Sequence, residues 1–189
     1  MVKNTFTELK FFFNEVVIVI KRKDILEELL NDSGWEYHNI FPATRKNTKL
    51  SLILTMLKRD ITFFNFCRKY KPDVMIGHSV EITHIGPILK IPSIVVNEDD
   101  AEIVPLQYKL VYPFATWLLA PDCCSVGKFG YKKISYPSYH ELAYLHPNQF
   151  TPDKAQIKKI DMSKPYFIMR FAKLTAHHDD GRQGISTSV

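Results

Sequence analysis

The sequence has no long hydrophobic run and none of the glycine-rich patterns that hold nucleotide phosphates. Its most apolar window, Phe11 to Ile20, is interrupted by Asn14 and Glu15 and is too short to span a bilayer, so we expect no transmembrane segment. No secretory signal is visible. Neither GxGxxG nor GxxxxGK(S/T) occurs, so the sequence supports neither a dinucleotide fingerprint nor a P-loop.

Cysteine is scarce, with three residues in 189: Cys67, Cys123 and Cys124. An odd number without the spacing of a disulfide framework predicts reduced thiols and a cytoplasmic protein. The adjacent pair lacks the CxxC geometry with which cysteines hold one metal ion. We therefore expect buried, unreactive thiols, with no metal and no cofactor.

The basic surplus is small and dispersed. The net charge is +5, from 25 Lys and Arg against 20 Asp and Glu. The basic residues occur in short groups such as Lys58-Arg59 and Lys132-Lys133, which usually mark solvated faces. Nucleic-acid binding would need them gathered on one surface, so no nucleic-acid partner is expected.

The stretch from Lys71 to Val104 organises the predicted fold. Two short apolar runs, Val74–Ile76 and Ile94–Val96, flank a connection of helical length, which is typical of a βαβ crossover. Gly86-Pro87 should break or kink the connecting helix. Because neither run alternates with polar residues, both are expected to be buried in a parallel sheet that is covered on both faces.

Other segments extend this pattern to an α/β fold: an open, mostly parallel, Rossmann-like sheet with helices on both faces. Val16–Ile20 and Trp117–Leu119 are expected to be neighbouring buried strands of this sheet. The further strands are expected at 35–40, 134–136 and 166–170. We assign residues 1–173 to one domain and 174–189 to an interdomain segment or tail.

Residues 48–70 form the longest helical pattern. Its predicted core stripe consists of Leu50, Ile53, Leu57, Ile61, Phe64 and Cys67. The nearby cluster Phe63, Phe64 and Phe66 is predicted to pack in the core rather than to bind a ligand.

Polar residues follow the two organising strands, where parallel sheets bind ligands. Gly77 lets the backbone approach a ligand, and His78 and Ser79 come next. Ser79 is expected either to cap the following helix or to contact an anion at the helix start. Both roles are compatible.

Asn97, Glu98, Asp99 and Asp100 end the second strand. Close carboxylates can shift each other's protons, as acid–base chemistry requires. We assign Glu98 and Asp99 to a site, and interpret Asp100 and Glu102 as an acidic helix start. His140 and Glu141 lie in a later proline-rich loop, which is a reasonable place for ligand contacts.

Seven segments resemble an uncharacterised bacterial and archaeal family (a domain of unknown function) that is similar to GT-B glycosyltransferases and UDP-N-acetylglucosamine 2-epimerases. They are KNTFTELK, VVIVIKRKDILEELLNDSGWEY, KPDVMIGHS, IPSIVVNEDD, LVYPFA, YHELAYLHPNQFTPD and PYFIMRFAKLTAHHDDGRQGIS. The resemblance implies an acceptor-side first domain, trimmed at both ends and inactive alone. Its implied partners are a nucleotide-sugar and a carbohydrate acceptor, and the trimmed ends would favour self-association.

The resemblance also places the segment 177–180 between two domains. The implied catalytic residues are His78, Glu98, Asp99 and His178. From their positions at strand ends, in the proline-rich loop and in the segment 177–180, the candidate ligand-binding residues are Gly77, Ser79, Asn97, His140, Glu141 and Asp179. Two alternatives remain open: a non-catalytic α/β ligand-binding or regulatory domain, and a metal-dependent hydrolase that uses His177, His178 and Asp179.

Overall fold

The computed structural model describes residues 2–21, 25–41, 49–153, 155, 157, 161 and 163–169. The chain divides into two units, Met1–His146 and Pro147–Val189, and the α/β fold lies in the first. The predicted domain boundary after residue 173 falls outside the described residues. Within them, no helix is long and apolar enough to cross a membrane.

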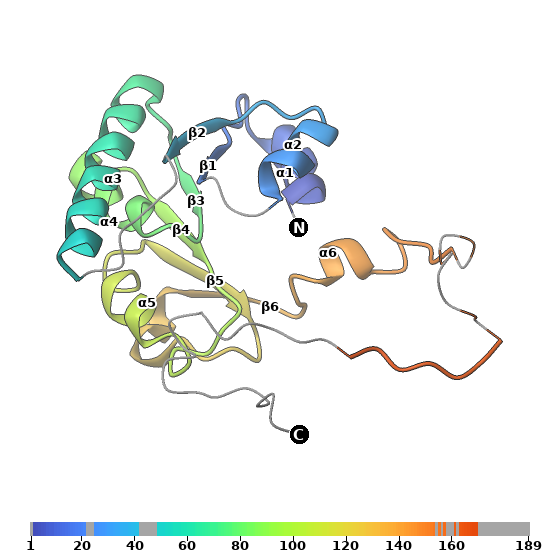
Figure 1. Ribbon diagram of the computed structural model, residues 1–189. Coiled ribbons are helices and arrows are strands. Elements are labelled where there is room, and N and C mark those ends of the chain that lie inside the picture. The colour runs from blue at the N-terminus through green and yellow to red at the C-terminus, as the bar shows by residue number, and fades with distance from the viewer. Residues whose placement is uncertain are drawn as a thin grey trace. The chain divides into compact units, whose positions relative to one another are not determined.

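The core of the first unit is a parallel sheet in the order β3-β4-β5-β6 (Figure 1). Its strands are β3 (Met75–Gly77), β4 (Ser93–Val96), β5 (Trp117–Pro121) and β6 (Lys133–Tyr136). The connecting helices are α4 (Val80–Leu89), α5 (Pro105–Leu110) and the 3-10 helix η1 (Gly127–Lys132). Alternating helices and parallel strands confirm the predicted α/β, Rossmann-like class.

A second, two-stranded parallel sheet pairs β1 (Val19–Lys21) with β2 (His38–Phe41). The helices α1 (Val2–Phe12) and α2 (Leu26–Asp32) belong to this region. The expectation that the first strand neighbours the organising strands is therefore wrong among the described residues. Phe41 nevertheless packs in the main core, with its ring 6.3 Å from that of Phe63 on α3 (Lys49–Tyr70).

The two faces of the four-stranded sheet differ in burial. Met75, Val95 and Leu118 are buried on the face that packs against the main core. Side chains on the opposite face remain partly exposed, including Ile76 at 42% and Trp117 at 44%, which flank Ile94 in register. The expected burial on both faces is thus found on one face only.

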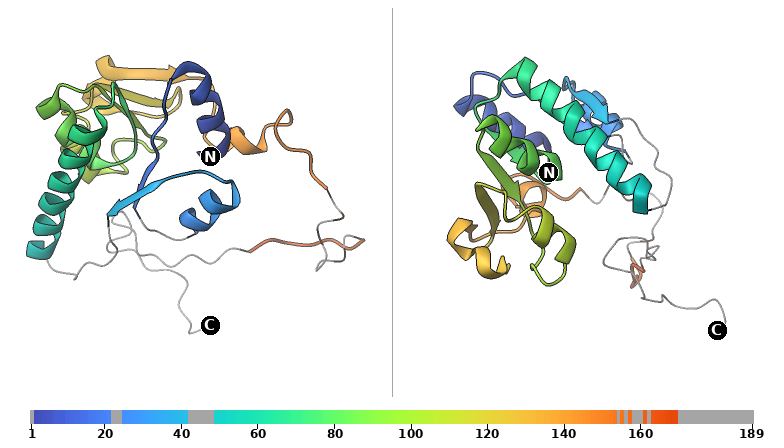
Figure 2. Two further views of the ribbon diagram at one scale, coloured as in Figure 1. Left: turned by 90° about the horizontal axis from the view of Figure 1, so that it is seen from above. Right: turned by 90° about the vertical axis from the view of Figure 1, so that its left-hand side faces the viewer.

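The long helix α3 lies beside α4, as Figure 1 and Figure 2 show. Its predicted core stripe is wrong for Leu57 and Ile61, which are more than half exposed. The side chains of Leu50 and Ile53 lie outside the described ones. Among the side chains of α3 that the structure describes, Phe63 and Cys67 are buried and Phe64 packs partly buried against the core, as predicted for these three residues. This helix is apolar around much of its circumference, so periodicity alone did not select the buried face.

Two further expectations about secondary structure are also wrong. α4 continues through Pro87 to Leu89, so the expected break at Gly86-Pro87 does not occur. The segment Tyr166–Met169 forms no strand, and its side chains are exposed. Without a neighbouring strand, β-branched and aromatic composition does not create a strand by itself.

Two consecutive lysines, Lys132 and Lys133, donate hydrogen bonds to backbone carbonyls in the loops before and after β5. The Lys132 ammonium donates to the carbonyl oxygens of Tyr112, Pro113 and Ala115, at 3.2, 2.8 and 2.7 Å. These carbonyls belong to the turn that leads from α5 into β5. Lys133 donates in the same way to the Cys124 carbonyl at 2.7 Å, in the loop that leaves β5. The last residue of η1 and the first residue of β6 therefore hold the segments before and after β5.

We expect Lys132→Met to destabilise the protein by about 2 kcal/mol, because it removes charged hydrogen bonds from three backbone carbonyls, and those to Tyr112 and Ala115 are partly buried. Urea denaturation measures the difference. Lys109→Met, at an exposed position of α5, is the matched control and should change the free energy of unfolding by less than about 0.5 kcal/mol. Equal effects of the two substitutions would contradict this role for Lys132.

The exposed apolar side chains predict self-association. Besides Ile76 and Trp117, Phe11 and Phe12 are exposed at 78% and 79% near the end of α1. Exposed apolar patches recruit partners, including a second copy of the same chain. In sedimentation velocity, the weight-average sedimentation coefficient should rise with protein concentration, and Trp117→Lys should reduce this rise. A monomer at all concentrations would overturn the prediction.

Candidate functional site

The carboxyl ends of β3, β4, β5 and β6 lie at one edge of the sheet, because all four strands run in the same direction. Gly77 ends β3 with φ of 158°, a conformation that residues with side chains rarely adopt. It turns the chain out of the sheet and places His78 at this edge. Asn97, Glu98 and Asp99 follow β4 at the same edge.

His140 comes to the same place from the far side of the sheet. β3 and β6 are the two edge strands, about 14 Å apart at the usual strand spacing. The ring of His140, in the loop after β6, nevertheless lies 5.9 Å from that of His78 in an edge-to-face arrangement. Its Nδ1 lies 2.7 Å from Oε2 of Glu98, an ion-pair distance at which the N–H is not aligned for a hydrogen bond. The loop therefore returns across the edge and joins three strand ends.

Two contacts hold His140 in this position. Tyr136, the last residue of β6, stacks on the imidazole with 6.2 Å between ring centroids and 10° between planes. The short helix α6 (Leu142–Leu145) follows, and the Asn4 amide donates to the Ala143 carbonyl at 2.7 Å. The His140 side chain is only 10% exposed. Sequence reasoning missed Tyr136, although its place at the end of a predicted strand was a usable signal.

The surroundings of His78 lower the pKa of its imidazole below the ordinary 6.5. The largest cause is incomplete hydration: the side chain reaches solvent, but the protein surrounds much of it. The positive charge of a protonated His140 acts in the same direction, while the carboxylates of Glu98 and Asp99 oppose it. His78 is therefore neutral at pH 7 and can accept a proton there.

Ser79 occupies the N-cap position of α4, but its hydroxyl makes no capping bond. It donates instead to the carboxylate of Glu81, which is buried with 2% of its surface exposed. Nε of Arg59 on α3 lies 2.7 Å from the other carboxylate oxygen. The predicted side-chain cap is thus wrong. Glu81 and Arg59, which sequence reasoning missed, fix the turn that carries His78.

The loop after β4 combines buried and exposed polar groups. Asn97 is buried and its amide donates to the Asp99 carbonyl, which fixes the loop backbone. Glu98 and Asp99 are exposed. Asp100 accepts a hydrogen bond from the Ser125 N–H at 2.7 Å and so joins this loop to the one after β5. The predicted acidic helix start is wrong, because α5 begins at Pro105 without an acidic residue in its first turn.

The cysteines differ from one another in exposure. Cys67 is buried on α3, as expected, and burial raises the pKa of its thiol to about 11. Cys123 is exposed and Cys124 is half-buried, so the prediction of buried thiols is wrong for this pair. Both follow β5 and therefore lie at the carboxyl edge.

The remaining predicted site residues do not add to this cluster. Glu141 is exposed at the start of α6. His178 and Asp179, like the whole segment 177–180, lie outside the described residues. Among the residues that are described, no group of three or more His, Cys, Asp or Glu side chains is placed to hold a metal ion.

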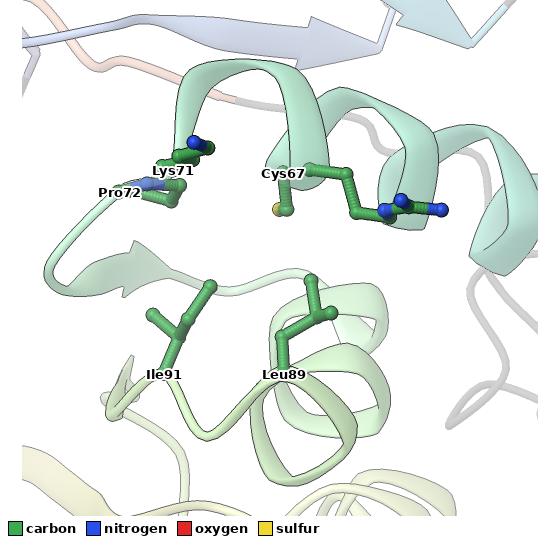
Figure 3. A pocket seen from close by; sticks show the side chains of 6 residues that line it. Cys67, Lys71, Pro72, Leu89 and Ile91 are labelled. Atoms are coloured by element: carbon green, nitrogen blue, oxygen red, sulfur yellow. The ribbon is translucent and has the colours of Figure 1, made fainter.

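A cavity of about 330 Å³ lies at the opposite end of the sheet (Figure 3). Its lining consists of Cys67, Arg68, Lys71, Pro72, Leu89 and Ile91, from the end of α3 and the segments that lead into β3 and β4. No predicted site residue lines it. The carboxyl edge is open to solvent instead, with His78, Glu98 and Asp99 exposed.

The architecture defines an α/β protein with a Rossmann-like parallel sheet and a polar cluster at its carboxyl edge. Among solved structures, the fold is similar to that of MurG from Acinetobacter baumannii, a GT-B glycosyltransferase, with a TM-score of 0.53 and 15% sequence identity. The match covers 72% of this chain and 41% of the MurG chain, so it spans less than half of that protein's length. No family model and no curated protein matches the sequence.

The titration of His78 tests the geometry of this cluster. By proton NMR of the imidazole, its midpoint should lie below 6.5, the ordinary value. His140→Gln should raise the midpoint by removing a nearby positive charge, and Asp99→Asn should lower it by removing a negative one. Shifts in the same direction, or no shift in either variant, would contradict the arrangement.

The same shift makes stability depend on pH. Well above pH 6.5, His78 is neutral in both the folded and the unfolded chain, so it does not make the free energy of unfolding depend on pH. Below it the unfolded chain binds a proton first, so the free energy of unfolding falls between pH 6.5 and the lower folded pKa. Urea denaturation across this range should show a smaller fall for His78→Gln than for the unsubstituted protein. If the free energy of unfolding fell equally in both proteins, His78 would not be a cause of the pH dependence.

Proposed function

We propose that this chain provides the acceptor-side domain of a GT-B-like, sugar-nucleotide-dependent glycosyltransferase or epimerase. The observation that supports the proposal is the convergence of His78, Glu98 and His140 at the carboxyl edge of a parallel sheet. The ligands of open α/β sheets bind at this edge. The fold similarity to MurG gives the class of enzyme in which to test it.

In this proposal His78 is the general base. Transfer of a sugar to a hydroxyl group requires the hydroxyl proton to leave as the oxygen attacks. A neutral imidazole that is exposed to solvent can take that proton at pH 7. Asp99, exposed beside it, offers carboxylate oxygens to the other hydroxyl groups of a carbohydrate acceptor.

Glu98 and His140 act as a pair. Because Nδ1 of His140 faces the Glu98 carboxylate, Nε2 is the ring nitrogen left to contact a ligand. The stacked ring of Tyr136 and the low exposure of His140 fix the orientation of that nitrogen. The pair therefore positions one polar contact next to the base, which favours a ligand with several oxygen atoms.

A second candidate is a non-catalytic domain that binds a carbohydrate or sugar nucleotide. The observation that favours it is the coverage of 41% of the MurG chain, because the groups that bind the second substrate need not lie in these 189 residues. Binding at this edge is common to both candidates, so only turnover, if it occurred, would favour the enzyme. For either one, the odd cysteine number favours a cytoplasmic location.

Ligand-observed saturation-transfer NMR tests the proposed site. UDP-N-acetylglucosamine and N-acetylglucosamine are the probes, and we expect weak binding of at least one by the full 189-residue protein, without turnover. His78→Ala and Glu98→Gln should each weaken that binding at least threefold while the urea midpoint changes little.

His146→Ala is the control, because His146 is exposed and follows α6. It should leave binding unchanged. Binding that survives both site substitutions would remove His78 and Glu98 from the site. Turnover by this chain would favour the enzyme over the binding domain and show that its chemistry needs no further groups.

A further inference from the structure

The two adjacent cysteines at the carboxyl edge form a pair that neither the fold nor the proposed function explains. Their sulfur atoms lie 4.0 Å apart, Cys123 is exposed, and the Cys124 thiol donates to the carbonyl oxygen of Glu98 at 3.0 Å. Cys124 is therefore attached to the backbone of the residue whose side chain contacts His140. We propose that Cys123 and Cys124 are a peroxide-sensitive modification site that forms a reversible vicinal disulfide.

The surroundings hold the two thiols together. Lys133 donates to the carbonyls of Asp122 and Cys124 on either side of Cys123, at 3.2 and 2.7 Å. The Asp100 carboxylate accepts the Ser125 N–H just after the pair. The loop is thus fixed at both ends, and the sulfurs must approach by about 2 Å for a bond to form, which requires rotation of both side chains and adjustment of the peptide between them.

The different solvent exposure of the two thiols determines which of them reacts first with peroxide. The Cys123 thiolate, open to solvent, attacks one oxygen of a hydroperoxide; the O–O bond breaks, an alcohol or water leaves, and Cys123 becomes a sulfenic acid. The Cys124 sulfur then attacks the sulfenic sulfur, the S–O bond breaks, and water leaves with the Cys124 proton. The two thiols lose two electrons in total, and the peroxide gains them. Cys124 is the resolving thiol, because it is half-buried and its thiol is held by the Glu98 carbonyl, whereas Cys123 is exposed. Burial is the largest cause that raises the pKa of Cys124, to about 11.

The disulfide would be easy to reduce. Adjacent Cα atoms are about 3.8 Å apart, whereas disulfides usually span about 4.4 Å or more, so a bond between neighbours is strained. Strained and exposed disulfides are the labile, regulatory ones. Such transient bonds are also the kind found in otherwise reduced proteins.

Oxidation would reach the candidate site through one bond. A disulfide sulfur has no proton, so the Glu98 carbonyl loses its donor when Cys124 is oxidised. The backbone that positions the Glu98 carboxylate beside His140 is then less restrained. This step does not depend on what the site binds, so the inference stands apart from the proposed function.

Intact-mass measurement with differential alkylation tests the site. Equimolar hydrogen peroxide should remove two hydrogen masses from the chain and protect Cys123 and Cys124 from alkylation, and dithiothreitol should restore both. Cys67 is the internal control, because it is buried and should be alkylated only after unfolding, before and after peroxide. In Cys124→Ser, a sulfenic acid should persist on Cys123 and be trapped by dimedone. In Cys123→Ser, peroxide should leave Cys124 largely unmodified.

The coupling is read from the His140 imidazole resonances, which should move on oxidation and return on reduction, while those of His84 on α4 stay in place. Dimedone adducts on Cys123 in the unsubstituted protein without a disulfide would overturn the proposal. Disulfides between two chains would overturn it as well. An intramolecular disulfide that leaves the His140 resonances unchanged would overturn the coupling to the site.

Discussion

The parallel pairing of four strands is the constraint on which the site depends. Parallel strands place all their carboxyl ends at one edge, so residues that follow β3, β4, β5 and β6 meet there although the chain between them passes through helices. This parallel pairing alone is sufficient to bring His78 and Glu98 to the same edge. His140 reaches them because the loop after β6 returns across this edge. Its contact with Glu98 fixes the position of that loop.

The carboxyl edge is polar and mostly open, while the structure beneath it is fixed. Asn97 is buried and holds the loop backbone, and Glu81 with Arg59 fixes the turn after β3. The exposed groups at the rim therefore stand on buried polar contacts, which is how a binding site keeps its geometry without ligand. The cavity near Cys67 lies at the other end of the sheet and has no such arrangement of carboxylates and imidazoles.

Much of the fold could be predicted from the sequence, because short β-branched runs between helical connections have few other solutions. The strands at Val74–Ile76 and Ile94–Val96 are found within one residue. The buried face of α3 was predicted in part: Phe63, Phe64 and Cys67 pack in the core as expected. Leu57 and Ile61 are exposed, because apolar residues occur on more than one face of this helix and periodicity does not choose between the faces. For the site, strand-end position placed His78 and Glu98 correctly. The proline-rich loop made His140 a candidate, but its contact with Glu98 depends on the path of that loop and could not be predicted. The exposure of Cys123 depends on a loop path as well and leaves no sequence signal.

The central claim is that residues from opposite edges of the sheet form one site, and a nuclear Overhauser effect between the imidazole protons of His78 and His140 tests it most directly. The ring centroids are 5.9 Å apart, so a cross-peak between their ring protons is predicted in the unliganded protein. The peak should disappear in His140→Gln. A well-assigned spectrum without that cross-peak, in a protein whose β3–β6 sheet is intact, would contradict the account.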